Sequence, residues 1–313
     1  MSATTRTIGV LGGGRWGFAL AKAVQTAGHG ALVCTRRDHV TPIEGIEQTA
    51  EIAELGKRTQ LILLAVPSNV ARAVAGVLGD VTDGSHMIVH GVRGLSDEGL
   101  LTLSEIVRQE TPVRRVGALG GPVVVDDLIN SQPAVIAAAS RYPEVLEAVR
   151  GALASPMLRV SETHDLTGLE WASALVGALM VALGYARAAG VSAGLLAGLM
   201  TRGMHEAMRI GVAAGAEEHT FWGVAGFGDL MAAMGNMARP EVRFGERIAS
   251  GVDAIEARRA NEMRIEAVDL LPRLVAFARD QRLHVPVFAA LDRVLKGEAD
   301  KASILPALMA PSR

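Results

Sequence analysis

The sequence predicts an α/β domain with a doubly wound parallel sheet, followed by an all-α domain. In the first half of the chain, short apolar runs alternate with segments in which hydrophobic residues fall at helical spacing. This alternation is typical of parallel sheets whose strands are joined by helices. From about Thr163 onward the spacing is helical throughout, and Gly and Ala become frequent, which favours helices alone.

Six apolar runs are predicted to form the strands of the sheet. They cover residues 8–11, 31–35, 61–66, 87–89, 115–119 and 134–139. A chain of 313 residues is long enough for two domains of ordinary size. We therefore predict a dinucleotide-binding domain over residues 1–162 and a helical substrate and dimerisation domain over residues 163–313.

The composition narrows the possible partners. Half of the residues are hydrophobic and the formal net charge is −2, so no basic surface for nucleic acid is expected. The one cysteine, Cys34, has no partner for an internal disulfide, and no signal-like segment opens the sequence. These features favour a cytoplasmic protein.

The most apolar stretch covers residues 171–200. Glu170, Arg187 and Arg202 limit it to uncharged pieces of about 16 and 14 residues, whereas a membrane-spanning helix needs about 20. We predict a pair of buried helices here and no membrane span.

A glycine loop follows the first predicted strand. Gly12, Gly14 and Gly17 stand in G-x-G-x-x-G register at the start of an amphipathic helix. In a Rossmann domain the first glycine permits a tight turn, the second lets the backbone approach a pyrophosphate, and the third packs helix against strand. The context predicts a bound nicotinamide dinucleotide, with Arg15 and Trp16 of the loop among its contacts.

The ends of two further strands suggest which dinucleotide binds. Arg36 and Arg37 follow the second predicted strand, where an NAD-binding domain commonly has an acidic residue for the ribose. Two guanidinium groups favour the 2′-phosphate of NADP(H), although a solvated turn with Asp38 as ribose ligand, and hence NAD, stays open. Val66 and Pro67, at the carboxyl end of the third run, are expected at the same cofactor-binding edge.

Several segments together resemble one enzyme family. They are "GGGRWGFALA", "AVPS", "VRGLSDEGLLTLSE", "HDLTGLEWASAL", "TRGMHEAMRIG", "TFWGVAGFGDL" and "RFGERIASG". From Ile8 to about Leu308 the chain resembles the bacterial NAD(P)-dependent glycerol-3-phosphate dehydrogenases. The resemblance implies a soluble homodimer that interconverts dihydroxyacetone phosphate, a small anionic substrate, and sn-glycerol 3-phosphate for phospholipid synthesis.

The resemblance also implies site residues. Asp229 matches the family's active-site Asp, Arg93 stands where the family has a Lys, and Glu266 is expected to contact the cofactor. The family's general acid/base Lys falls on Val176. The Asn beside that Lys falls on Gly177. The family's S-R-N motif, whose Arg and Asn face substrate and cofactor, falls on Arg239, Pro240 and Glu241.

No other lysine is available to replace the missing one. The four lysines are Lys22, Lys57, Lys296 and Lys301, so the span from Arg58 to Leu295 contains none. Arg93 can hold an anion, but a guanidinium stays protonated at neutral pH and is a poor acid/base.

Other candidates have both a functional and a structural interpretation. Asp229 is expected either at the site or as a helix N-cap, and Arg239 and Arg243 either bind an anion or face solvent. Glu170 is an acid candidate only if it is buried. The histidines that could replace the lysine are His90, His164, His205 and His219.

Three functions therefore compete. The first is an oxidoreductase of this family with an altered substrate or impaired activity. The second is a catalytically degenerate member that binds NADP(H) for structural, sensing or partner-recognition purposes. The third is ordinary glycerol-3-phosphate dehydrogenase activity with an unrecognised proton donor.

Overall fold

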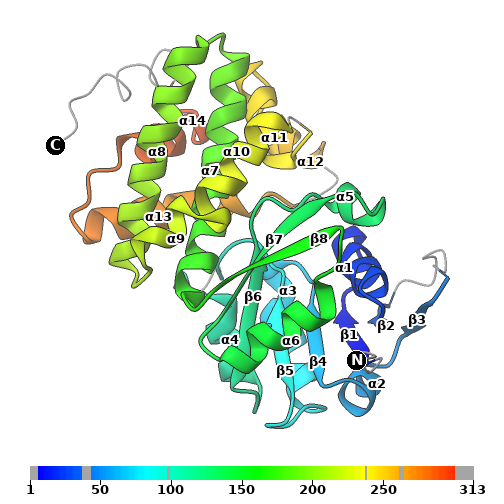
Figure 1. Ribbon diagram of the computed structural model, residues 1–313. Helices are drawn as coiled ribbons and strands as arrows, with labels where there is room; N and C mark the ends of the chain where they lie inside the picture. The colour runs from blue at the N-terminus through cyan, green and yellow to red at the C-terminus, as the bar shows by residue number, and fades with distance from the viewer. Residues whose placement is uncertain (1–5, 37–43, 97–98, 237, 261–263, 300–313) are drawn as a thin grey trace. The chain divides into compact units, whose positions relative to one another are not determined.

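The computed structural model describes residues 6–36, 44–96, 99–236, 238–260 and 264–299 (Figure 1). The chain forms two compact units. The first comprises Met1–Val92 and Leu101–Leu169, and the second comprises Arg93–Leu100 and Glu170–Arg313. The second unit thus takes one short segment from the N-terminal half, and that segment begins with Arg93. The expected functional division after Glu162 stays a prediction.

The first unit contains an eight-stranded sheet with the order β3-β2-β1-β4-β5-β6-β7-β8. The strands are β1 (Thr7–Leu11), β2 (Gly30–Cys34), β3 (Ile46–Thr49), β4 (Leu61–Leu64), β5 (Met87–His90), β6 (Arg115–Gly120), β7 (Ala134–Ser140) and β8 (Leu158–Thr163). The order places β1 between β2 and β4, so the ends of these three parallel strands meet at one edge.

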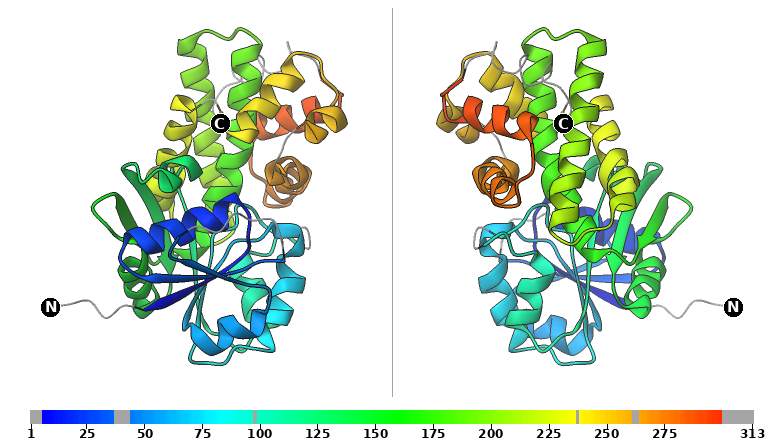
Figure 2. Two further views of the ribbon diagram at one scale, coloured as in Figure 1. Left: turned by 90° about the vertical axis from the view of Figure 1, so that its right-hand side faces the viewer. Right: turned by 90° about the vertical axis from the view of Figure 1, so that its left-hand side faces the viewer.

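Helices cover both faces of this sheet, as a doubly wound fold requires (Figure 2). The helices are α1 (Arg15–Thr26), α2 (Ile52–Arg58), α3 (Ser68–Gly79), α4 (Leu103–Glu110), α5 (Val125–Ile129) and α6 (Pro143–Leu153). Side chains of α1, α5 and α6 pack into one apolar cluster, and side chains of α2, α3 and α4 pack into the cores of the other face.

The sheet differs from the sequence prediction in two respects. β7 pairs antiparallel with β6, because the segment between them contains only the five-residue α5 and forms no long crossover. The strands β3 and β8 were not predicted. They lie at the two edges of the sheet, and after one buried residue at the start of each strand the other side chains are half-buried or exposed, so neither contains a continuous apolar run.

The described residues of the second unit form helices and no strand. After α7 (Leu166–Ala188) come α8 (Ala193–Ala213), α9 (Glu218–Trp222), a π-helix (Val224–Gly228), α10 (Asp229–Gly235), α11 (Pro240–Ala249), α12 (Ala254–Arg259), α13 (Glu266–Asp280) and α14 (Pro286–Leu295). The helix α7 is long and apolar enough to cross a membrane, but 94% of its most apolar window is buried inside the protein. It is the core helix around which the others pack.

Two glycines allow α7 and α11 to pack with their backbones in contact. A Cβ atom at Gly184 of α7 would overlap the carbonyl oxygen of Val242, and a Cβ at Gly245 of α11 would overlap that of Val181. Only glycine fits at either position, so this reciprocal contact fixes the position of α11 on α7.

We predict that Gly245→Ala lowers the free energy of unfolding by about 1–3 kcal/mol or more, because the added methyl group must push the two helices apart. The matched control is Gly198→Ala in α8, where a Cβ atom would meet nothing within 4 Å. The control should be neutral or stabilising by up to about 1 kcal/mol, since Ala is the better helix former. Denaturant unfolding of both variants measures the difference, and equal effects would contradict the close-packing argument.

Candidate functional site

The glycine loop between β1 and α1 is tightly packed at two glycines and open at the third. Gly12 has a φ of +129°, and a Cβ atom there would overlap the carbonyl oxygen of Ala65. At Gly17 a Cβ would overlap the carbonyl oxygen of Gly12. At Gly14 a Cβ would meet nothing within 4 Å. The loop therefore has room for a ligand at the one glycine whose predicted role is to let a pyrophosphate approach.

The N-terminus of α1 has the features of an anion site. Its N-cap is Gly14, which supplies no side-chain cap, and the first turn carries no acidic residue. The backbone N–H groups of this turn have no partner within the helix, and the helix dipole favours negative charge there. A dinucleotide pyrophosphate fits this loop. Backbone N–H groups, rather than side chains, would hold the pyrophosphate.

Two further predicted contacts, Arg15 and Trp16, begin α1 itself. Nη2 of Arg15 lies 2.5 Å from Oδ1 of Asp126, and both side chains are largely exposed. Nε1 of Trp16 is buried and donates no hydrogen bond among the described residues. The indole lies against Gly91, just after β5, where a Cβ atom would overlap Nε1. The loop thus holds the indole at the edge where β1, β4 and β5 end.

Three other predicted contacts lie beyond the carboxyl ends of neighbouring strands. Arg36 is exposed two residues beyond the end of β2, and Val66 and Pro67 follow β4, with Pro67 as the N-cap of α3. Because β2 and β4 flank β1, these residues and the glycine loop share one edge of the sheet. Arg37 lies outside the described residues.

In the second unit, Asp229 is the centre of a buried ion cluster. Its side chain is 0% exposed. One carboxylate oxygen, Oδ2, lies 2.7 Å from Nη1 of Arg93, and the other, Oδ1, lies 3.1 Å from Nη2 of Arg239. Glu241 joins the cluster, with Oε1 at 3.8 Å from Nε of Arg93. We call these four residues the Asp229 cluster.

The local sequence explains how these side chains meet. The π-helix that precedes α10 contains Gly226, where a Cβ would overlap the carbonyl oxygen of Phe221. Asp229 is the first residue of α10, whose N-cap is Gly228, so the alternative that Asp229 caps the helix is wrong. Its carboxylate is instead occupied by the two arginines, because a charge buried this deeply needs opposite charge beside it.

The arginines of the Asp229 cluster stay charged. Burial disfavours the guanidinium of Arg93, but Asp229, Glu241 and Glu266 outweigh this effect and raise the pKa of Arg93 above its ordinary value. Burial lowers the pKa of Arg239, and the nearby carboxylates of Asp229 and Glu241 oppose that effect. Arg93 is therefore a permanent cation that binds Asp229 and has no role in proton transfer near neutral pH.

The helix α7 offers an apolar surface at Val176, the position on which the sequence resemblance places an acid/base lysine. Val176 is fully buried in the core of the second unit. The side chain of Arg93 runs along the same helix: its Cδ lies 3.8 Å from a Cβ built at Gly177, and its Nη1 is 3.5 Å from the carbonyl oxygen of Ser173. The positive charge beside Asp229 thus comes from the segment before Gly94 and not from α7.

Two acidic candidates lie in this unit as well. Glu266 opens α13, and its carboxylate lies against Gly94 and interacts electrostatically with Arg93. Its predicted contact with a cofactor stays a prediction. Glu170 is buried, at 3% exposure, and burial is required of it as a candidate acid. Arg243 is exposed, in agreement with its interpretation as a solvent-facing residue.

The histidines considered as replacement donors make contacts of their own. His90 is buried at the end of β5 with Nε2 3.2 Å from Oγ of Ser104, and His164 has Nδ1 3.2 Å from the carbonyl oxygen of Ser140. His205 bonds to Thr201 of its own helix and stacks edge-on against Trp222. His219 is exposed beside Glu217.

One buried carboxyl group titrates close to neutral pH. Burial raises the pKa of Glu206, on α8, from 4.5 to about 7, although its carboxylate accepts hydrogen bonds from the backbone N–H groups of Val287 and Phe288. These N–H groups begin α14, and Arg202 lies 3.5 Å away. Glu206 therefore connects α8 to the N-terminus of α14, which is a structural role.

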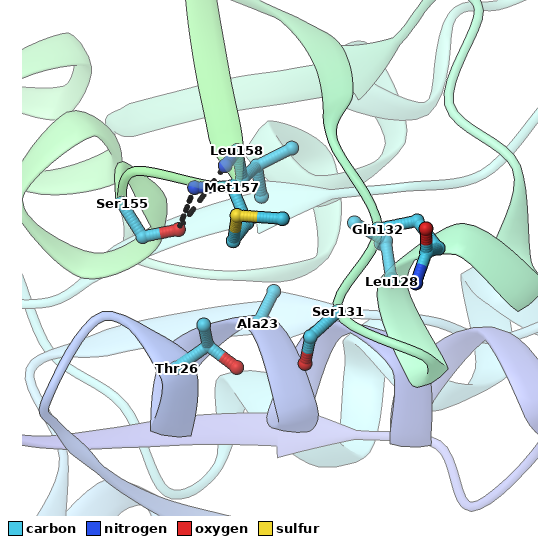
Figure 3. Close-up of a pocket in the computed structure, with 8 residues that line it drawn as sticks. All are labelled: Ala23, Thr26, Leu128, Ser131, Gln132, Ser155, Met157 and Leu158. Carbon is cyan, nitrogen blue, oxygen red and sulfur yellow. Dashed lines mark hydrogen bonds between the residues drawn. The ribbon is translucent and has the colours of Figure 1, made fainter.

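Two other features carry no site chemistry. A small pocket in the first unit, lined by residues of α1, α5 and the segment before β8, holds about 10 Å³, which is room for roughly one water molecule (Figure 3). Among the described residues, no three His, Cys, Asp or Glu side chains gather as metal ligands.

The chain is similar to known proteins in sequence and in structure. Residues 39–146 match the model of the NAD-dependent glycerol-3-phosphate dehydrogenase N-terminus, and residues 165–306 match that of the C-terminus. The first match begins after the glycine loop. The chain is 30% identical to a glycerol-3-phosphate dehydrogenase [NAD(P)+] of Azorhizobium caulinodans, over 99% of this chain and 98% of that protein.

Other similar proteins give the same picture. A glycerol-3-phosphate dehydrogenase [NAD(P)+] of Halothermothrix orenii is 28% identical, over 96% of this chain and 94% of that protein. The crystal structure of glycerol-3-phosphate dehydrogenase from Coxiella burnetii has the same fold, with a TM-score of 0.90 at 23% identity over 98% and 99% of the two chains.

The glycine loop leads to a prediction with two contrasting variants. Gly14→Ala should leave the free energy of unfolding nearly unchanged and weaken dinucleotide binding by about 10-fold or more, since the methyl group enters the space left for the pyrophosphate. Gly17→Ala should lower the stability itself, because its methyl group overlaps the backbone of Gly12. Unfolding curves and NADPH titrations of both variants measure this, and a stable Gly17→Ala protein would contradict it.

Glu206 leads to a prediction about pH. Its pKa is higher in the folded protein than in the unfolded chain, so the folded state binds the proton more tightly between pH 4.5 and about 7. The contribution of Glu206 to stability is therefore full below pH 4.5 and declines as pH rises to about 7. Glu206→Gln should flatten this slope in unfolding curves measured at several pH values, and an unchanged slope would contradict the assignment.

Proposed function

Since this chain belongs to the NAD(P)-dependent glycerol-3-phosphate dehydrogenase family, we propose that it is a dinucleotide-binding oxidoreductase with strongly impaired reduction of dihydroxyacetone phosphate. The observations that carry the proposal are the Asp229 cluster and the complete burial of Val176 in the core. The family aspartate is retained, but both of its oxygens are held by arginines and the acid/base lysine is replaced by an apolar side chain.

The cofactor part of the proposal rests on the glycine loop. Gly12 and Gly17 pack the loop tightly, and Gly14 leaves open space at a helix N-terminus without a side-chain cap, which suits a pyrophosphate. Arg36, exposed beyond β2, favours NADPH over NADH, because a guanidinium suits a 2′-phosphate. A bound nicotinamide would supply the hydride; the chain itself must bind it, orient the substrate and provide a proton.

The proton is the missing part. Reduction of a carbonyl group requires an acid near the carbonyl oxygen, and loss of such an acid costs about 10²- to 10⁴-fold in rate. In the Asp229 cluster, the arginines are permanent cations, and the carboxylate of Asp229 accepts a hydrogen bond from Arg93 and forms an ion pair with Arg239. These groups can position a substrate but are poorly suited to protonate it.

A second candidate is a catalytically degenerate member that binds NADP(H) without turning over any substrate. The ion pairs that Asp229 forms with Arg93 and Arg239 favour it, because a carboxylate paired with two guanidinium groups is poorly suited to exchange a proton with a substrate. For either candidate, residues 1–162 would bind the dinucleotide, residues 163–313 would bind substrate, and the family resemblance supports a cytoplasmic homodimer.

Titration with NADPH and NADH, followed by assays with dihydroxyacetone phosphate and a panel of small carbonyl compounds, tests the proposal. We expect NADPH to bind more tightly than NADH and dihydroxyacetone phosphate to be reduced far more slowly than by ordinary family members. Absence of dinucleotide binding below about 1 mM would refute the cofactor part. Ordinary turnover would refute the impairment, and no turnover with any carbonyl compound would favour the second candidate.

A gain-of-function variant tests whether a lysine is the missing proton donor. We predict that Val176→Lys combined with Arg93→Lys raises kcat for dihydroxyacetone phosphate by about 10²-fold, since it restores an amine on α7 and removes the arginine that occupies Asp229. Val176→Met with Arg93→Lys is the matched control, because Met is similarly long and unbranched but has no proton to transfer. Unfolding curves establish that both variants are folded, and equal kcat values would show that the lysine is not the missing element.

A further inference from the structure

Glu241 lies where the family has an uncharged Asn, and it brings a carboxylate to the cations of the Asp229 cluster. We propose that Glu241 acts as an internal anion there, so that the site selects carbonyl substrates without a phosphate group. This inference rests on the proposed function, because it concerns the substrate class of the same site.

The charges of the cluster support this inference. Two guanidinium groups, those of Arg93 and Arg239, face the carboxylates of Asp229 and Glu241, and Glu266 adds a third carboxylate that interacts with Arg93. The formal sum of these five groups is one negative charge. Each arginine is already neutralised by the protein, so neither is left to attract a dianion.

Burial makes this neutralisation effective. Side-chain exposure is 0% for Asp229, 10% for Arg239, 13% for Glu241 and 27% for Arg93. Charges in such surroundings interact strongly and are weakly screened by salt. A phosphate group could bind the arginines only by displacing a carboxylate that would then remain buried near it, and this repulsion opposes binding.

The start of α11 strengthens the same conclusion. Its first residue is Pro240, which has no backbone N–H, and Glu241 follows in the first turn. An anion gains stabilisation at a helix N-terminus from N–H donors and from the helix dipole. Here Pro240 lacks one N–H donor, and the first turn already carries the carboxylate of Glu241. The N-terminus of α11 is therefore a poor binding site for a phosphate group.

The substrate class that fits is an uncharged polyhydroxylated carbonyl compound. Its hydroxyl groups can donate to the carboxylates and accept from the guanidinium groups without a change in charge. Its reduction to an alcohol takes one hydride, supplied by the reduced dinucleotide of the proposed function, and one proton, supplied by a water molecule that leaves as hydroxide. The products are the alcohol, the oxidised dinucleotide and hydroxide, which the buffer neutralises.

Calorimetric titration of the full chain with glycerol 3-phosphate, with and without NADPH, tests the internal anion. We expect no binding to the unmodified protein below about 10 mM and at least a 10-fold gain in affinity for Glu241→Gln, because an arginine then becomes available. Glu241→Asn, the family residue, should give the same gain. Glu246→Gln is the control, since it removes the same charge from the same helix more than one turn away.

Two results would overturn the inference. One is binding of glycerol 3-phosphate to the unmodified protein below about 10 mM, and the other is an equal affinity of the Glu241 and Glu246 variants. In parallel, the rate with dihydroxyacetone should exceed that with dihydroxyacetone phosphate, and the ratio should shift towards the phosphate by about 10-fold in Glu241→Gln. Titrations without NADPH test the inference alone. The proposed function is refuted by different results, namely absence of dinucleotide binding or ordinary turnover of dihydroxyacetone phosphate.

Discussion

The second unit of this protein is organised around one electrostatic constraint, the complete burial of the Asp229 carboxylate. A buried charge without a partner is strongly destabilising, so Arg93 and Arg239 must stay beside it. Arg93 comes from a short segment inserted from the N-terminal half of the chain, Asp229 begins α10, and Arg239 precedes α11. The same interaction therefore joins three separate parts of the chain and leaves them little freedom to rearrange around a substrate.

The scaffold keeps the family fold, and the difference that we propose lies in the site. Gly184 and Gly245 let α7 and α11 pack backbone to backbone, and the overall fold matches that of a family crystal structure. Within that scaffold Val176 is buried on α7, and the counter-ion of Asp229 is supplied from outside α7. Packing constraints preserve the fold because changes there cost stability, whereas site residues can vary while the fold is kept.

Much of the fold was predictable from hydrophobic periodicity. The central strands β1, β2, β4, β5, β6 and β7 are buried enough to form apolar runs, and the helical half shows a 3.6-residue period. The edge strands β3 and β8 carry a weaker signal, because an edge strand is half covered and its polar residues interrupt the pattern. The antiparallel β7 was missed for another reason: the direction of a strand depends on the connection before it and not on its own residues.

For the site, the sequence by itself determined the glycine loop and the absence of a lysine between Arg58 and Leu295. Both follow from local chemistry, since a turn that demands glycine and a missing residue type are properties of the chain alone. Only the tertiary structure decided that Arg93, Asp229, Arg239 and Glu241 meet, and that Asp229 does not cap its helix. These residues lie up to 148 positions apart in sequence. They meet because the carboxylate of Asp229 is buried in the folded protein, and a buried charge needs an opposite charge beside it.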